Sequence, residues 1–307
     1  MKHDLTSLQN LTRKEILSIL DLTEKLKENK SMFAEQLKGK SIGLLFQKPS
    51  NRTRVSFEVG IWQLGGNCIY LGPDEINLGV RESTEDVSKT LSRYLDCIVA
   101  RTNSHTDIEA LTKYADIPII NGLSDLYHPC QGLTDIFSMR EKFGKTEGLT
   151  MAYIGDGNNV CHSLLLGCSK VGMNLHIATP KGYEPNAEII ETAKFSAETT
   201  GAKILLTQDP QEAVQNVDAI YADVWVSMGQ EEETKRRLKQ FKNFQINTEL
   251  LSKAKNTCIF MHCLPAHRGQ EVTAEVMDGP QSIVFDQAEN RLHTQKAILL
   301  FLLNQGL

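Results

Sequence analysis

Short apolar runs alternate with polar, helix-like segments along almost the whole chain. The run IGLLF (42–46) is typical of a buried strand, and Val55, Val59 and Trp62 after it recur at helical spacing. The further strand-like runs are CIVAR (97–101), IPIIN (117–121), LTMAYIG (149–155), NLHIAT (174–179), AKILLT (202–207), DAIYADV (218–224) and CIFMHC (258–263). Strands that alternate with helices predict an α/β fold with parallel sheets that helices cover on both faces.

The two ends of the chain and one internal seam suggest how the elements are divided. Near the N-terminus, Thr12 and Glu15 form the capping box of a helix, and AENRLHTQKAILLFLL (288–303) predicts a long closing helix. The polar, glycine-containing stretch EKFGKTEGLT (141–150) precedes a fresh strand, and a second crossing is expected near DGPQS (278–282). A length of 307 residues also favours two cores over one. We expect one domain from 1–145 with 287–307 and another from 146–286, each a parallel-sheet α/β sandwich, linked by helices.

Composition and charge narrow the class of protein. Hydrophobic residues make up 41% and charged residues 23% of the chain, and the net charge of −5 gives no sign of a nucleic-acid or anionic-membrane surface. The polar start lacks the apolar segment of a signal peptide, and the run AILLFLL is too short to cross a bilayer. Seven cysteines without regular spacing fit reduced thiols better than a disulfide framework. We therefore expect a soluble cytoplasmic protein.

The stretch SNRTR (50–54) crowds two arginines where the first strand ends and a helix begins. Pro49 before it marks the turn, and a helix N-terminus with its unpaired N–H groups is a natural anion site. Helix capping would explain Ser50 or Thr53 but not the arginines, which are unfavourable at this end of a helix. Surface ion pairs are the other ordinary explanation. No glycine-rich phosphate loop with its lysine is present, so the pattern favours a phosphate or carboxylate cradle over a nucleoside triphosphate.

Polar residues follow other strand-like runs, at the edge where open α/β sheets bind ligands. Arg101 closes CIVAR, and HPCQ (128–131) precedes a helix expected to begin near Gly132. DVWVSMG (223–229) enters a loop after Asp223, and HCLPAHRG (262–269) places a histidine and a cysteine at a strand end. Each has a structural alternative, such as a sheet-end charge, a strand-to-loop connection or a buried inert thiol.

Two other chemistries fit the chain less well. IGDGNNV (154–160) lies between a strand and a helix like a dinucleotide motif, but it lacks the third glycine, and the next strand ends without an acid for the ribose. Cysteines and histidines between 258 and 267 suggest zinc, yet Cys263 points to the opposite face of the strand from Cys258 and His262. We expect neither a metal nor a cofactor.

Seven stretches, in the same order along almost the whole chain, resemble the carbamoyltransferases, and among them the ornithine carbamoyltransferases. They are SNRTR (50–54), ARTNSH (100–105), LYHPCQGLTD (126–135), GDGNNVCHS (155–163), DVWVSMGQE (223–231), MHCLPAHRGQEV (261–272) and AENRLHTQKA (288–297). The first and third are shared with aspartate carbamoyltransferases and mark only the phosphate half. The SMG and HCLP stretches are the ones that resemble the ornithine branch.

The resemblance implies which residues carry the function. The N-terminal domain would bind carbamoyl phosphate and the C-terminal domain L-ornithine, with the active site in the cleft between them and the closing helix returning to the first domain. The residues implied for carbamoyl phosphate are Ser50, Asn51, Arg52, Thr53, Asn77, Arg101, His128, Gln131, Cys263, Leu264 and Arg291, of which Arg101, His128 and Cys263 would be catalytic. Those implied for ornithine are Asn159, Asp223, Ser227 and Met228.

Assembly and two departures also follow from the resemblance. Members of the family form trimers, sometimes in higher multiples, and the loop INLGVRES (76–83) would bring Asn77 to the neighbouring subunit's site. Family members often carry a longer glutamine or histidine at that position. Asn51 replaces the usual threonine or serine, another short hydrogen-bonding side chain.

These residue types suit transfer of a carbamoyl group to an amine. Several arginines at a helix start would bind a small dianion, and donors from Thr53, Arg101 and His128 would stabilise the oxyanion formed on attack. Asp223 suits the α-ammonium of an amino acid, and Cys263, if ionised, could influence the protonation of the reacting amine. Another amine acceptor such as putrescine, and a non-catalytic anion-binding relative, are the alternatives that the sequence leaves open.

Overall fold

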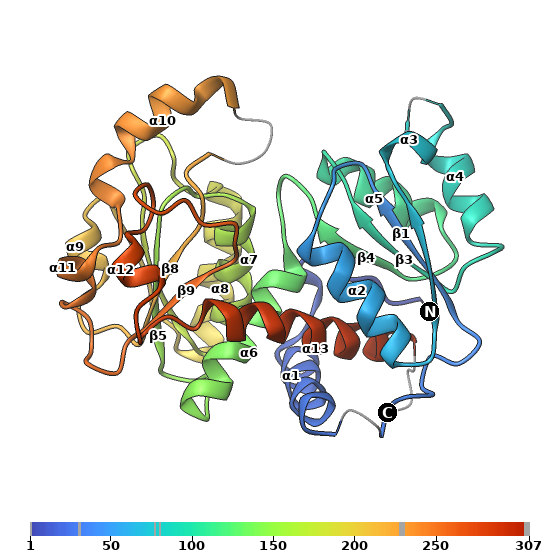
Figure 1. Ribbon diagram of the computed structural model, residues 1–307, viewed down its shortest axis with the longest axis horizontal. Coiled ribbons are helices and arrows are strands. Elements are labelled where there is room, and N and C mark those ends of the chain that lie inside the picture. Colours follow the sequence, from blue (N-terminus) through green and yellow to red (C-terminus); the bar gives the residue numbers. More distant parts are fainter. Residues whose placement is uncertain (1, 30–31, 77, 80, 227–230, 304–307) are drawn as a thin grey trace. The chain divides into compact units, whose positions relative to one another are not determined.

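The computed structural model describes residues 2–29, 32–76, 78–79, 81–226 and 231–303. The chain forms two compact units, unit 1 (Met1–Phe137 with Glu289–Leu307) and unit 2 (Ser138–Ala288). Figure 1 labels their helices and strands. Each unit contains one parallel sheet, as the alternation of strands and helices predicts.

Unit 1 is built on a four-stranded sheet in the order β2-β1-β3-β4. Its strands are β1 (Ser41–Phe46), β2 (Asn67–Leu71), β3 (Cys97–Arg101) and β4 (Ile119–Leu123). Its helices are η1 (Leu8–Asn10), α1 (Arg13–Glu28), α2 (Arg52–Gln63), α3 (Pro73–Ile76), α4 (Thr84–Leu91) and α5 (His105–Tyr114). Two longer helices, α6 (Pro129–Phe143) and α13 (Val284–Leu303), contain the residues at which unit 1 passes into unit 2.

The first helix begins where the sequence predicts. Thr12 Oγ1 accepts a hydrogen bond from Glu15 N at 3.2 Å, and Glu15 Oε2 accepts one from Thr12 N at 2.7 Å. This confirms the capping box, which satisfies two N–H groups that have no partner inside the helix.

Helices pack on the sheet of unit 1 through apolar side chains. Ile108 and Leu111 of α5 are buried in one cluster with Leu45 and Ile98 of the sheet. Helix α2 contacts β2 and also packs on α13 at Gly60, where a Cβ atom would lie 3.1 Å from Lys296 Cγ. A side chain at position 60 would require Lys296 to shift, so the glycine allows the two helices to approach closely here.

The apolar positions that predict α2 do not lie in the core. Val55, Val59 and Trp62 recur at helical spacing and the helix is present, but these side chains are 49%, 38% and 77% exposed. The buried residues of the helix are instead Thr53, Phe57, Gly60 and Ile61. Helix α2 therefore presents an apolar stripe to its surroundings.

The edge strand β2 has no counterpart among the sequence predictions. Its burial alternates weakly, and Ile69 remains 46% exposed. A strand that pairs on only one side lacks the continuous apolar run of a central parallel strand, so its sequence, NCIYL, gives a weak signal.

Unit 2 is built on a five-stranded sheet in the order β7-β6-β5-β8-β9. Its strands are β5 (Thr150–Ile154), β6 (Asn174–Ala178), β7 (Ile204–Thr207), β8 (Ala219–Ala222) and β9 (Ile259–His262). Its helices are α7 (Asn159–Lys170), α8 (Ala187–Thr200), α9 (Pro210–Ala213), η2 (Glu231–Glu233), α10 (Thr234–Gln240), η3 (Lys242–Phe244), α11 (Thr248–Leu251) and α12 (Ala274–Met277). Each strand lies within a run that the sequence predicts as strand.

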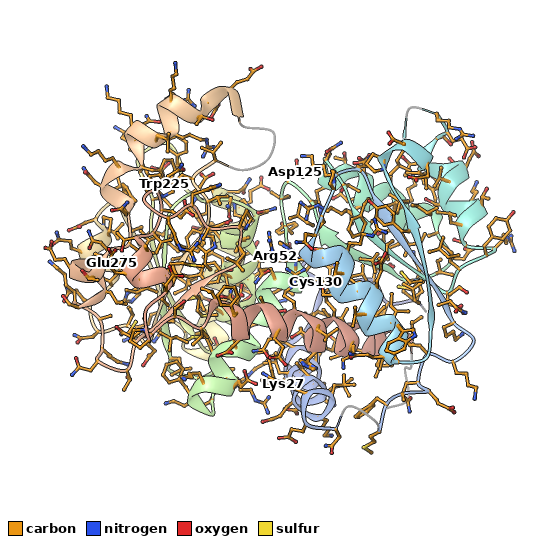
Figure 2. All side chains as sticks on the ribbon, viewed as in Figure 1. Lys27, Arg52, Asp125, Cys130, Trp225 and Glu275 are labelled. Carbon is orange, nitrogen blue, oxygen red and sulfur yellow. The ribbon has the colours of Figure 1, made fainter. Side chains whose placement is uncertain are left out.

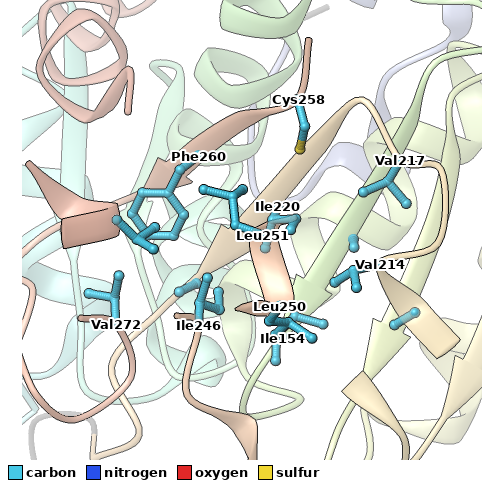
Figure 3. Packing of buried hydrophobic residues seen from close by; sticks show 14 of the residues in the cluster. Ile154, Val214, Val217, Ile220, Ile246, Leu250, Leu251, Cys258, Phe260 and Val272 are labelled. Carbon is cyan, nitrogen blue, oxygen red and sulfur yellow. The ribbon is translucent and has the colours of Figure 1, made fainter. Parts of the chain in front are cut away.

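The core of unit 2 joins its central strands to the short helices. Figure 3 shows Ile154, Ile220 and Phe260 of three strands packed with Val214 and Leu250. Burial of side chains of this size is favourable by about 1.5–3 kcal/mol each. The cluster thus packs three neighbouring strands, β5, β8 and β9, against these short helices.

Candidate active site

Polar side chains gather at the carboxyl edge of the sheet of unit 1. SNRTR follows β1, Arg101 closes β3, and His128 lies between β4 and α6. The strand that follows β1 in the chain, β2, lies on one side of the β1/β3 pair, and the strand that follows β3, β4, lies on the other. Ligands of open α/β sheets bind at the carboxyl ends of two such strands. Figure 2 shows Arg52 where α2 begins.

Arg291 joins residues that are far apart in the sequence. Its Nη1 donates to Gln131 Oε1 at 2.6 Å, and its Nη2 donates to Thr53 Oγ1 at 3.1 Å. Gln131 Nε2 in turn donates to Asp135 Oδ1 at 2.8 Å, which fixes the orientation of the amide. All of these side chains are buried. Helices α2, α6 and α13 thus meet at one guanidinium group.

Arg101 is a buried cation beside other cations. Only 6% of its surface is exposed, and its Nε has no hydrogen-bond partner among the described residues. Burial, together with repulsion from Arg291 and Arg52, lowers the pKa of Arg101 to about 10. A buried charge is normally paired. A bound anion beside Arg101 would therefore be stabilised by these cations.

His128 completes the group as a neutral side chain. It is 5% exposed, and burial followed by repulsion from Arg291, Arg101 and Arg52 holds its pKa well below the usual value. A neutral imidazole can donate a hydrogen bond without adding to the positive charge. Helix α6 begins at Pro129 rather than near Gly132, because proline is favoured at the first position of a helix.

The residues of SNRTR divide into two kinds. Ser50 Oγ accepts a hydrogen bond from Thr53 N at 3.2 Å, whereas the side chain of Asn51, the N-cap residue, makes no capping bond. Arg54 pairs with Glu58 at 2.8 Å and lies 3.6 Å from the ring centre of Tyr70. Arg54 therefore follows the surface ion-pair interpretation, and Arg52 belongs to the arginine cluster.

In unit 2, Asp223 follows β8 and is held by neutral donors. Its Oδ2 accepts from Asn158 Nδ2 at 2.7 Å, and its Oδ1 accepts from Val224 N at 2.8 Å and from Cys263 Sγ at 3.0 Å. Asp223 is 6% exposed. This contact links the sulfur of Cys263 directly to the carboxyl group of Asp223.

The turn after β9 has an unusual backbone. Leu264 has a φ of 60° and precedes Pro265 through a cis peptide bond. The N–H of Leu264 donates to His262 Nδ1 at 2.9 Å, and His262 Nε2 lies 3.3 Å from Glu271 Oε1. A branched residue in the left-handed region is disfavoured, and such positions concentrate at functional sites.

Sequence reasoning missed two features of unit 2. Asn158 caps α7 through hydrogen bonds from Val160 N at 3.0 Å and Cys161 N at 3.2 Å, while its amide nitrogen orients Asp223. Paired asparagines before a helix were the available signal for this role. Arg237 forms a buried ion pair with Asp156 at 2.8 Å and donates to Trp225 O at 3.0 Å. The two residues are 81 positions apart, so no local sequence pattern predicts this ion pair.

Of the other residues implied by the resemblance, the structure describes Asn159 but not three further residues. Asn159 is the first residue of α7 and is half-buried. Asn77, Ser227 and Met228 lie outside the described residues.

The glycines of IGDGNNV serve packing within unit 2. A Cβ atom on Gly157 would lie 2.3 Å from Pro185 N, and Gly157 N donates to Tyr183 O at 2.9 Å. The close approach that requires glycine is made by the chain itself. Within the described ranges, no three histidine, cysteine or acidic side chains are grouped as metal ligands. The described helices also include none that is both long and apolar enough to span a membrane.

Comparison with known proteins gives a consistent result. Residues 3–141 match the family model of the aspartate/ornithine carbamoyltransferase carbamoyl-P binding domain, and 147–302 match that of the Asp/Orn binding domain. The chain is 52% identical over 303 residues to an ornithine carbamoyltransferase from Caldicellulosiruptor saccharolyticus, with 98% of each covered. A relative of the same name from Oceanobacillus iheyensis is 53% identical, covering 98% of this chain and 94% of the relative.

The solved structures agree with these relatives. The ornithine carbamoyltransferase from Pyrococcus furiosus superposes with a TM-score of 0.96 and 48% identity, covering all of this chain and 98% of that one. The enzyme of that name from Thermus thermophilus gives a TM-score of 0.89 and 44% identity over 98% of both chains. The protein belongs to the aspartate/ornithine carbamoyltransferase family.

Proposed function

We propose that this protein transfers the carbamoyl group of carbamoyl phosphate to the side-chain amine of L-ornithine, giving L-citrulline and phosphate. The observation that carries the proposal is the burial of Arg101 among like charges. The only charged groups that shift its pKa are two other cations, Arg52 and Arg291. A doubly charged phosphoryl donor would relieve that repulsion. The relatives named above are all ornithine carbamoyltransferases, which supports ornithine as the acceptor.

Carbamoyl phosphate would be held by unit 1. Ser50, Asn51, Arg52 and the first N–H groups of α2 would bind the phosphate, with Arg291 completing the pocket. Thr53, Arg101 and His128 would direct donors at the carbamoyl oxygen, with Gln131 beside the carbamoyl group. Because His128 stays neutral, it can donate a hydrogen bond to the oxyanion without forming an ion pair with it.

Ornithine would be held by unit 2. Asp223 would pair with the α-ammonium group, and Asn159, Ser227 and Met228 would contact the rest of the amino acid. Cys263 and the carbonyl of Leu264 would lie beside the reacting amine and the carbamoyl group. The hydrogen bond from Cys263 to Asp223 supports this placement, because it links the thiol to the carboxylate that orients the acceptor.

The reaction needs a neutral amine and a good leaving group. The amine lone pair forms a C–N bond to the carbamoyl carbon, the bond from that carbon to the phosphate oxygen breaks, and the amine proton ends on the departing phosphate. Phosphate leaves while clamped by the same arginines. Positioning and preorganised charge would supply most of the acceleration.

The larger organisation of the protein is part of the proposal. Residues 1–145 with 287–307 would form the carbamoyl-phosphate domain and 146–286 the ornithine domain. A cytoplasmic homotrimer with Asn77 reaching the neighbouring site would use the exposed stripe of Val55, Val59 and Trp62 as part of its contact surface. The enzyme would act in arginine biosynthesis, or in reverse in arginine breakdown.

A panel of acceptors tests the proposal. The protein is supplied with carbamoyl phosphate and, separately, L-ornithine, putrescine, L-aspartate or N-acetylornithine, and each carbamoylated product is measured. We expect citrulline as the main product. Carbamoylputrescine in excess of citrulline would overturn the choice of acceptor, and phosphate binding without any product would identify a non-catalytic relative.

A further inference from the structure

Gln295 is a buried amide one helical turn after Arg291 on α13. None of its surface is exposed. Its Nε2 donates to Ser56 Oγ at 2.6 Å, and its Oε1 accepts from Arg291 Nε at 3.2 Å and from Arg291 Nη2 at 2.8 Å. Neither the sequence motifs nor the proposed mechanism gives Gln295 a role.

The neighbours of the amide fix its orientation. Ser56 donates its single hydroxyl proton to the carbonyl of Arg52 at 2.6 Å, so the serine oxygen is left to accept. The Gln295 nitrogen must therefore face Ser56, and its oxygen must face the guanidinium group of Arg291. One amide thus ties the first turn of α2 to α13.

We infer that Gln295 is a positioning residue for the anion site: it fixes the plane of the Arg291 guanidinium group without neutralising it. The inference rests on the carbamoyl phosphate site proposed above. Gln295 holds Nε and Nη2 of Arg291, Gln131 holds Nη1, and Thr53 also accepts from Nη2. All three nitrogens are oriented before a ligand arrives, so binding does not have to order the side chain.

The choice of an amide rather than a carboxylate is the informative detail. Residues four apart on a helix face each other, and a glutamate at 295 would form an ion pair with Arg291. That pair would hold the guanidinium group equally well but would cancel the charge that the cluster offers to an anion. Glutamine supplies the same acceptor oxygen with no charge.

Two substitutions separate geometry from charge. Gln295→Glu keeps an acceptor oxygen for Arg291 but neutralises the positive charge of Arg291. Gln295→Met leaves that positive charge in place but removes the acceptor oxygen. Because the new carboxylate would neutralise Arg291, we expect Gln295→Glu to weaken binding of inorganic phosphate, measured by titration calorimetry, roughly 10- to 100-fold. For Gln295→Met we expect roughly a 3- to 10-fold loss. KM for carbamoyl phosphate should rise in parallel, while KM for ornithine at saturating carbamoyl phosphate stays within about twofold, a split that general loss of structure would not give.

Gln63→Glu is the matched control. Gln63 Oε1 accepts from Lys296 Nζ at 3.0 Å, so the substitution places the same new charge beside another buried cation of unit 1. Gln63 lies about 15 Å along α2 from Thr53, beyond the range of strong interaction at physiological ionic strength. We expect its phosphate affinity to stay within about twofold of the parent protein.

The outcomes keep this inference apart from the proposed function. Unchanged phosphate affinity in a Gln295→Glu protein that melts like the parent overturns the inference, even if citrulline is formed. The expected loss of phosphate affinity in a protein that forms no citrulline supports the inference and overturns the proposed function. Should Gln295→Met fail to fold, Ser56→Ala decides the geometric part, with an expected loss of roughly 2- to 5-fold, and parent-like phosphate binding in Ser56→Ala would contradict it.

Discussion

Arg101 in unit 1 and Arg237 in unit 2 are buried to a similar degree, with 6% and 5% of their surface exposed. Arg237 is compensated within its own unit: it pairs with Asp156 at 2.8 Å and with Glu233 at 3.1 Å. The pKa of Arg101 is lowered first by burial and then by repulsion from Arg291 and Arg52. The contrast separates a cation that stabilises a fold from a cation that a ligand can use, because no acidic group is among those that shift the pKa of Arg101.

In unit 2, the residue proposed to bind the acceptor is a buried anion rather than a buried cation. Asp223 is a single buried carboxylate held by an amide, a backbone N–H and a thiol, all of them neutral donors. Those donors fix its direction and leave its negative charge available for an ammonium group. Unit 1 thus holds a cluster of positive charge and unit 2 a buried carboxylate, and the hydrogen-bond partners named above for Arg291 and Asp223 are uncharged.

The largest effect expected from this contrast is on stability in unit 2. Arg237→Met leaves Asp156 buried without its partner and should lower the free energy of unfolding by about 3–5 kcal/mol. Denaturation by urea at neutral pH measures it. Arg236→Met is the control, since Arg236 is 63% exposed and contacts Glu233 at the surface, where such pairs contribute about 0–1 kcal/mol. Equal stability of the two variants would contradict the compensated role of Arg237.

The same substitution in unit 1 should act in the opposite direction on stability. Arg101→Met removes a buried charge that repels its neighbours, so the free energy of unfolding should rise by about 1–3 kcal/mol. Activity should fall, because loss of one oxyanion donor typically lowers kcat by about 10²–10³. Urea denaturation and citrulline assays on the same preparation test both effects.

Arg54→Met is the control for Arg101. Arg54 lies in the same motif but is paired at the surface with Glu58, and its loss should change stability by less than about 1 kcal/mol. A stable, fully active Arg101→Met protein would remove Arg101 from the site. A destabilised one would show that its charge is compensated after all.

Much of this arrangement could be predicted from local sequence. Central strands such as β1 and β3 are continuous apolar runs, and the polar motifs at their carboxyl ends are the positions at which we propose that ligands bind. The capping box at Thr12 fixed a helix start within one turn. Edge strand β2 was not predicted because it is only half-buried. The start of α6 was predicted near Gly132, three residues too late, because the helix begins at Pro129 itself.

The supporting contacts could not be predicted in the same way. Arg291 meets Thr53 across 238 positions of sequence, and Arg237 meets Asp156 across 81. Such pairs exist only once the sheets and helices have packed, so no local period or spacing encodes them. The same holds for Gln295, whose importance depends on the residues that α2 places opposite it.

The smallest expected effect concerns the histidines of unit 1. Burial, with Lys296 and Lys27 opposing and Glu289 favouring the charged form, lowers the pKa of His293 to about 4. The unfolded chain therefore takes up a proton as the pH falls through about 6.5, while the folded protein does not, so stability is full above that pH and is lost below it. Between pH 7 and pH 5.5 one such histidine should lower the free energy of unfolding by about 1 kcal/mol. His293→Gln removes that contribution, so urea denaturation at the two pH values should give a difference smaller by this amount than in the parent protein. An unchanged difference would mean that His293 titrates alike in the folded and unfolded protein, and that unit 1 does not hold this histidine neutral.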